Sequence, residues 1–169
     1  MKIKKLLPVF ILSFFLNINL IAQSNFEIPA DNKLLTKQDS IKMGKDVIEA
    51  AKWIITTDLD KDEVKRKGVN GFVLKWYIDN IGLNMSLVEK LSEMNEGNSD
   101  LLLVYFAGAS KYFIENKPSK NGFEATKAGL LSVIEVYKKG IGITKSKGLE
   151  DLTKLKEENK LDQYIKNNF

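Results

Sequence analysis

The stretch "LLLVYFAGASKYFIEN", residues 101–116, is the most apolar part of the sequence beyond residue 22. Its residues are apolar on almost every side over 101–109, which predicts a helix at the centre of a helical bundle. The stretch "GFEATKAGLLSVIEVYKKG", residues 122–140, has helical periodicity and ends at a glycine suited to terminate a helix. We therefore predict a central antiparallel hairpin formed by residues 100–116 and 122–139.

Each helix of this hairpin carries an interior glycine, Gly108 in the first and Gly129 in the second. A glycine inside a helix destabilises it by about 1 kcal/mol relative to alanine, so a structural reason is expected for both. Alanine and serine flank each glycine, and small residues let two helix backbones approach closely. We predict that the two small-residue patches face each other. The alternative is that the glycines line a ligand pocket.

The rest of the sequence beyond residue 35 is also typical of helices separated by short polar breaks. Apolar residues recur at three- and four-residue steps over about 36–56, 86–95, 149–159 and 161–166. Ser86 and Glu89 have the spacing of a capping box at a helix start. Residues 70–82 combine a helical stripe with the β-branched and aromatic content of a strand, and we interpret them as a helix.

These patterns predict an all-α fold, a single compact bundle of about five to seven helices over residues 36–169. A chain of this length buries enough surface to fold without covalent cross-links. Residues 23–35 have no sustained period and contain Pro29, so we expect a flexible lead-in there.

The first 22 residues have the pattern of a secretory signal peptide. Lys2, Lys4 and Lys5 precede the apolar run "LLPVFILSFFL", and Ala22 provides a small residue at the expected cleavage point. The run is shorter than the roughly 20 residues of a membrane-spanning helix, although an uncleaved anchor is the alternative. We expect an exported protein, periplasmic or secreted, cleaved after Ala22 and with no membrane attachment afterwards.

Charge argues against a nucleic-acid partner. Three of the 26 basic residues lie in the leader and all 22 acidic residues follow it, which leaves one more basic than acidic side chain. A nearly neutral chain lacks the basic surface that binds phosphate backbones. Only one residue, Arg66, is an arginine, the residue type best suited to recognise phosphates and base edges.

Composition excludes several kinds of chemistry. The sequence contains neither cysteine nor histidine, so disulfides, thiol nucleophiles, thiolate zinc sites and histidine-dependent catalysis are ruled out. The G-x-S-x-G and S-x-x-K motifs of serine hydrolases are also missing. We predict no cofactor and favour a protein that is not an enzyme.

An acid-rich stretch, "WIITTDLDKDEVKRKG" (residues 53–68), raises the question of a calcium site. An EF-hand loop starting at Asp58 needs glycine at its sixth position and glutamate at its twelfth, where this chain has Glu63 and Val69. We therefore interpret Asp58, Asp60, Asp62 and Glu63 as helix-capping residues rather than metal ligands. Asp60 is the expected N-cap, paired with Glu63, of a short helix that continues to about residue 67.

Two hypotheses about function remain. The first is a binding or interaction protein with an unknown protein or peptide partner, such as an inhibitor or immunity-type partner of another envelope protein. Trp53, Trp76 and Tyr77 are its candidate anchors, because interfaces favour aromatic residues, and core packing is the alternative role for each. The second is a carboxylate-dependent hydrolase or small-ligand binder with a cleft between helices. Glu135 is its first candidate, either buried among Val133, Ile134 and Val136 or simply on the wet face of the helix.

Processing of the leader can be measured directly. Because Ala22 is the small residue that precedes the expected cleavage point, the exported protein should begin at Gln23. Intact-mass spectrometry of protein recovered from the envelope or medium checks this. A mass that includes residues 1–22 would contradict the expectation and support the anchored alternative.

Overall fold

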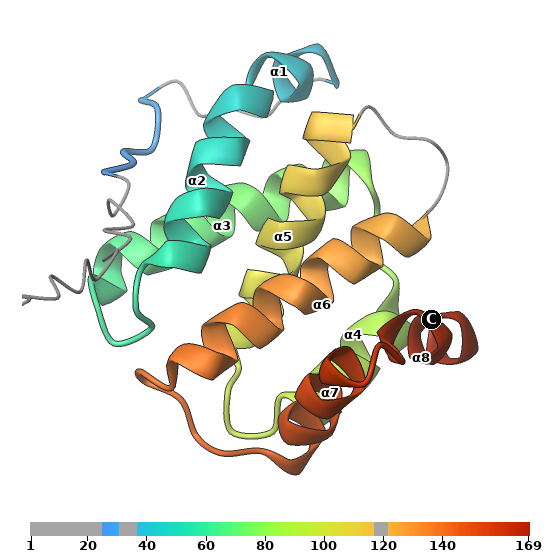
Figure 1. Ribbon diagram of the computed structural model, residues 1–169. Coiled ribbons are helices and arrows are strands. Elements are labelled where there is room, and N and C mark those ends of the chain that lie inside the picture. Colours follow the sequence, from blue (N-terminus) through green and yellow to red (C-terminus); the bar gives the residue numbers. More distant parts are fainter. Residues whose placement is uncertain (1–24, 31–36, 117–121) are drawn as a thin grey trace, which may run out of the picture.

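The core of the molecule is built around α5 (Asp100–Asn116) and α6 (Gly122–Lys139). The computed structural model describes residues 25–30, 37–116 and 122–169. Helix α5 runs through the middle of the molecule, contacts α2, α3, α4 and α6, and is crossed by α6 running back in the opposite sense (Figure 1). Every residue from Val104 to Ser110 is buried. The predicted central hairpin is therefore present.

The two interior glycines explain why these helices pack so closely. A Cβ atom added at Gly108 would lie 2.9 Å from the carbonyl oxygen of Ala128, and one added at Gly129 would lie 2.9 Å from that of Tyr105. Each glycine therefore faces the backbone of the opposite helix. The prediction that the small-residue patches face each other is confirmed at Gly108, which lies against Ala128 and Ser132, whereas Gly129 packs against Tyr105.

Six further helices surround this pair in the described part of the chain (Figure 1): α1 (Lys37–Lys42), α2 (Gly44–Thr56), α3 (Glu63–Asn80), α4 (Met85–Met94), α7 (Lys147–Glu157) and α8 (Leu161–Asn168). Helices α2 and α3 pack against α5, whereas α7 and α8 pack against α6. The described residues form helices and connections and contain no strand. None of these helices is long and apolar enough to cross a membrane.

Eight helices stand in the described residues, where a bundle of five to seven is predicted, and helix boundaries differ from the prediction at two places. The first predicted helix is interrupted at Met43. A Cβ atom added at the next residue, Gly44, would lie only 3.3 Å from the Ile114 side chain. Conversely, the two predicted segments 60–67 and 70–82 form the single helix α3. Buried contacts of Phe72 and Trp76 outweigh the low helix propensity of the glycines within α3.

The start of α4 is capped by a different residue from the one predicted. The side-chain oxygen of Asn84 accepts a hydrogen bond from the Leu87 amide at 3.2 Å, so the predicted capping box of Ser86 and Glu89 is wrong. Before this cap, α3 ends at Asn80, and Gly82, two residues later, has a φ of +91° in the left-handed region that favours glycine. This turn redirects the chain from α3 into α4.

The segment that precedes the helices is anchored to them where it is described. Phe26 is buried and its ring stacks on Phe72 with centroids 6.3 Å apart. Glu27 forms an ion pair of 2.9 Å with Lys65. Residues 25–30 therefore pack on α3 rather than forming a free lead-in. The predicted leader, residues 1–22, and the remaining residues of the lead-in (23, 24 and 31–35) lie outside the described residues.

Substitution of Gly129 tests whether the fold depends on this close contact. Gly129→Ala should lower the free energy of unfolding by about 1–3 kcal/mol, because the new methyl group meets a backbone carbonyl that cannot move aside. Gly71→Ala is the matched control, since its Cβ atom would meet nothing within 4 Å. It should instead stabilise the protein by about 0.5–1 kcal/mol. Urea denaturation of both variants measures the difference, and equal stabilities would show that the glycine contact is dispensable.

Candidate functional site

A cleft of about 600 Å³ lies between the end of α3, the start of α4, the start of α6 and α8. Its volume falls within the range of about 300–1,000 Å³ that is usual for small-molecule sites. We call it the tyrosine cleft, because Tyr77 and Tyr105 form its floor. Tyr105 comes from α5 and Tyr77 from α3, so the floor is formed where α3 meets the central helix pair.

The floor carries a small network of hydroxyl groups. Tyr105 donates a hydrogen bond to the Thr126 hydroxyl at 3.3 Å, and the phenol of Tyr77 lies close enough to that of Tyr105 to influence its pKa. Burial raises the pKa of both tyrosines above the ordinary value for a phenol. Both side chains therefore stay neutral at physiological pH. The floor is polar but uncharged.

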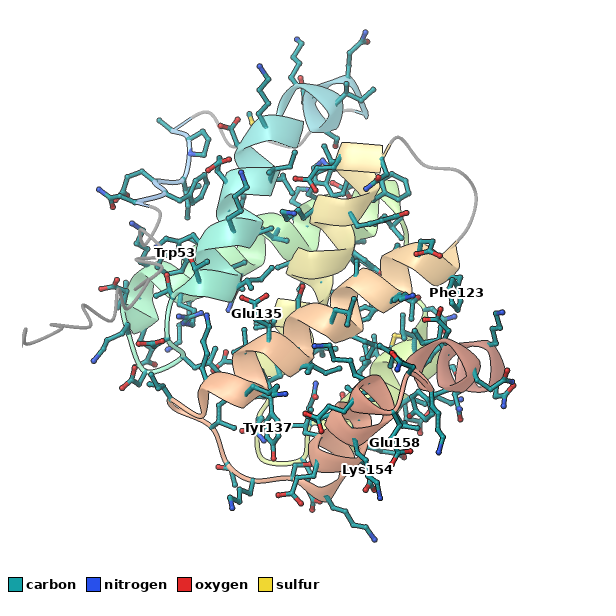
Figure 2. The ribbon with its side chains drawn as sticks, in the orientation of Figure 1. Trp53, Phe123, Glu135, Tyr137, Lys154 and Glu158 are labelled. Carbon is teal, nitrogen blue, oxygen red and sulfur yellow. The ribbon has the colours of Figure 1, made fainter. Side chains whose placement is uncertain are left out.

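The walls of the tyrosine cleft are apolar and its rim is basic. Besides the two tyrosines of the floor and Ala125, five lining side chains are aliphatic or aromatic: Ile81, Leu87, Phe123, Ile165 and Phe169. Figure 2 shows one of them, Phe123, at the start of α6 beside α8. At the rim, Lys90 and Lys166 are exposed. No aspartate or glutamate is among the described residues that line the cleft.

The three aromatic residues proposed as partner anchors are all in the core. Trp53 is 2% exposed, and Trp76 and Tyr77 are each 4% exposed. The indole of Trp76 donates a hydrogen bond to the Ser40 carbonyl at 2.9 Å, which ties α1 to α3. Core packing, the alternative role, thus accounts for Trp53 and Trp76, whereas Tyr77 also reaches the cleft.

Glu135 occupies the solvent-exposed face of α6 and not a buried position (Figure 2). It borders a shallow groove of about 280 Å³ whose lining also includes Lys52, Lys111 and Glu115. Glu115 is exposed and forms an ion pair of 2.9 Å with Lys111. The groove therefore contains two solvent-exposed acids and no buried carboxyl group among the described residues that line it.

The acid-rich connection between α2 and α3 surrounds a buried charge. Arg66 is 3% exposed, and its guanidinium group donates hydrogen bonds to the carbonyls of Thr57 at 3.0 Å and Asp58 at 2.5 Å. The same group lies 5.2 Å from the ring centroid of Trp53, within cation–π range. Arg66 therefore holds the α2–α3 connection against the body of the fold.

Electrostatics give the acids of this connection a second role. Burial lowers the pKa of Arg66, and the negative charges of Asp100, Asp62, Asp58 and Asp60 oppose that shift. In the described ranges, no three acidic side chains gather into a group that could hold a metal ion. We infer that these aspartates balance the charge of the buried guanidinium.

The predicted capping role of these acids is wrong in its details. Helix α3 begins at Glu63, close to the predicted position, but its N-cap is Asp62 in a left-handed conformation with φ of +49° and no side-chain capping bond. Asp60 is therefore not the N-cap. Glu63 forms an ion pair of 2.7 Å with Lys67 instead of reaching back to a cap.

Sequence reasoning identified only Tyr77 among the residues of the tyrosine cleft. Tyr105, Thr126, Lys90 and Lys166 come from four different helices, and no local motif connects them. A comparison with protein families, curated proteins and solved structures gives no match to this chain. We therefore infer function from the side chains that the fold brings together.

Replacement of Arg66 tests its structural role. Arg66→Met should lower the free energy of unfolding by about 2–4 kcal/mol, because it leaves the carbonyls of Thr57 and Asp58 without their charged donor. Lys67→Met, an exposed position on the same helix, is the control and should change it by no more than about 0.5 kcal/mol. Urea denaturation provides the measurement. A loss for Arg66→Met no greater than that of the control would contradict this role.

Proposed function

We propose that this chain is an exported binding protein that holds a small apolar or amphipathic molecule in the tyrosine cleft. One observation carries the proposal: a cleft of about 600 Å³ combines apolar walls with a neutral hydroxyl floor. Binding sites for small molecules are typically concave and mostly apolar, with a few polar groups that orient the ligand. The tyrosine cleft has these properties, and its floor is fixed by the central helix pair.

The cleft favours binding over hydrolysis. A carboxylate-dependent hydrolase needs two acids on either side of the scissile bond, or at least one buried carboxyl group near the substrate. The described lining of the tyrosine cleft contains no acid, and Glu135 is exposed on another face of α6. The hydroxyl groups of Tyr105 and Thr126 bond each other rather than any base. We therefore propose a binding protein without catalytic activity.

Export is part of the proposal and is supported by sequence alone. The basic start, the apolar run and Ala22 form a signal-peptide pattern. The absence of cysteine from the sequence agrees with a protein whose stability does not depend on the redox state of its compartment. A periplasmic or secreted binding protein fits both features.

A protein partner is a second candidate, favoured by one feature of the surface. Ile78, Leu83 and Met85 are exposed apolar residues at the end of α3 and the start of α4, next to lining residues of the cleft. This chain would then act as an inhibitor- or immunity-type partner of another envelope protein, which would insert an apolar side chain into the tyrosine cleft. Such a partner must compete with small molecules for the cleft, and one that leaves their binding unchanged would contradict this second candidate.

Binding in the tyrosine cleft can be tested with a neutral fluorescent probe such as Nile red. The protein should bind the probe saturably at one site, and Ala125→Trp should weaken binding at least about tenfold, because the indole would occupy the cleft. Glu150→Trp adds the same side chain on α7, away from the cleft, and should leave affinity unchanged. Thermal denaturation confirms that both variants fold. Failure to bind the probe, or equal binding by both variants, would overturn the proposal.

A further inference from the structure

The charged side chains that line the tyrosine cleft are all basic among the residues described. Lys90 on α4 and Lys166 on α8 line it from two different elements, and none of the lining side chains described is acidic. Many other lysines of the protein are neutralised by ion pairs, for example Lys75 with Asp79 at 2.8 Å. The mouth of the cleft thus differs from surfaces where the charges are balanced.

Lys166 forms no ion pair with a carboxylate of the described residues, although one lies within reach along its own helix. Asp162 precedes it by four residues, the spacing at which helical ion pairs form. Asp162 is instead bound by Lys127 of α6 at 2.6 Å. The ammonium group of Lys166 lies 5.7 Å from the ring centroid of Phe123, on the cleft wall.

Lys90 is held in a similar way. Its ammonium group donates a hydrogen bond to the Asn168 carbonyl and lies 5.5 Å from the ring centroid of Phe169. It forms no ion pair with any carboxylate of the described residues. The ammonium group of each lysine therefore lies within cation–π range of an aromatic residue of the cleft wall. Each also retains hydrogen-bonding capacity, since an ammonium group has three donors.

We propose that the ligand of the tyrosine cleft is an amphipathic carboxylate whose apolar chain lies between the aromatic and aliphatic walls and whose head group is bound by Lys90 and Lys166. This inference rests on the proposed function and specifies its ligand class. A carboxylate bound there would supply the negative charge that no described lining side chain supplies, next to the apolar walls that would hold its chain. The neutral phenols of Tyr77 and Tyr105 add no repulsion beneath it.

A matched set of ligands separates the head group from the chain. Decanoate, decan-1-ol and decylamine share a chain and differ in charge, and acetate carries the head group alone. Displacement of Nile red should give decanoate roughly tenfold higher affinity than decan-1-ol, the size expected for pairing with two exposed lysines. Decylamine should bind more weakly than the alcohol, and acetate should not displace the probe.

Variants of the two lysines complete the experiment. Lys90→Gln combined with Lys166→Gln should abolish the preference for decanoate over decan-1-ol, measured as the ratio of the two affinities within the same variant. The control combines Lys145→Gln with Lys147→Gln, two exposed lysines outside the cleft, which changes the net charge equally and should preserve the preference. Thermal denaturation verifies that both double variants are folded.

The outcomes distinguish this inference from the proposed function. If the alcohol or the amine binds as tightly as decanoate, or if the control removes the preference as fully as the cleft variant, the head-group assignment is wrong while the cleft remains a binding site. If neither Nile red nor any of the chains binds, the proposed function fails together with it.

Discussion

The close contact between α5 and α6 is the constraint on which the rest of the structure depends. Gly108 packs on the backbone of α6 and Gly129 on the backbone of α5, so neither position has room for a side chain. The loss of helix propensity at two glycines is small compared with the surface buried from Val104 to Ser110. Four further helices are arranged around this pair: α2 and α3 pack against α5, and α7 and α8 pack against α6. A bulkier residue at either glycine would push α5 and α6 apart, and with them the helices that pack on each.

The same contact forms the floor of the tyrosine cleft. The ring of Tyr105 lies over Gly129, one helical turn beyond Thr126, and this register brings the Tyr105 hydroxyl to the Thr126 hydroxyl. The ring of Tyr77 then approaches from α3 and packs on Phe106 with centroids 4.6 Å apart. The hydroxyl network is therefore a consequence of how two glycines align two helices. The feature that explains the fold also positions the polar groups of the candidate site.

Much of the fold follows from short-range patterns in the sequence, whereas the site does not. Apolar periodicity and the interior glycines predict the central hairpin, because both reflect the packing of one helix face against its neighbour. The continuity of α3 was missed, since Phe72 and Trp76 stabilise it through contacts with distant parts of the chain. The role of the acid-rich connection was missed for a similar reason, as Asp100 of α5 is far in sequence from Arg66. For Tyr77 the sequence leaves a partner anchor and a core residue open, because an aromatic residue has the same local pattern at an interface and in a core. The cleft itself is assembled from residues of several helices, and only the folded chain brings Lys90 and Lys166 to one rim.

The two sides of the tyrosine cleft are held with unequal strength. Its floor is part of the most deeply packed helix pair, whereas its outer wall, α8, is fixed mainly by two buried residues, Leu161 and Ile165. Short elements with few buried side chains open at a lower free-energy cost than the core does. We therefore expect fraying of α8 to set the rates at which a bound molecule enters and leaves, so that exchange with solvent proceeds quickly while the rest of the bundle stays folded.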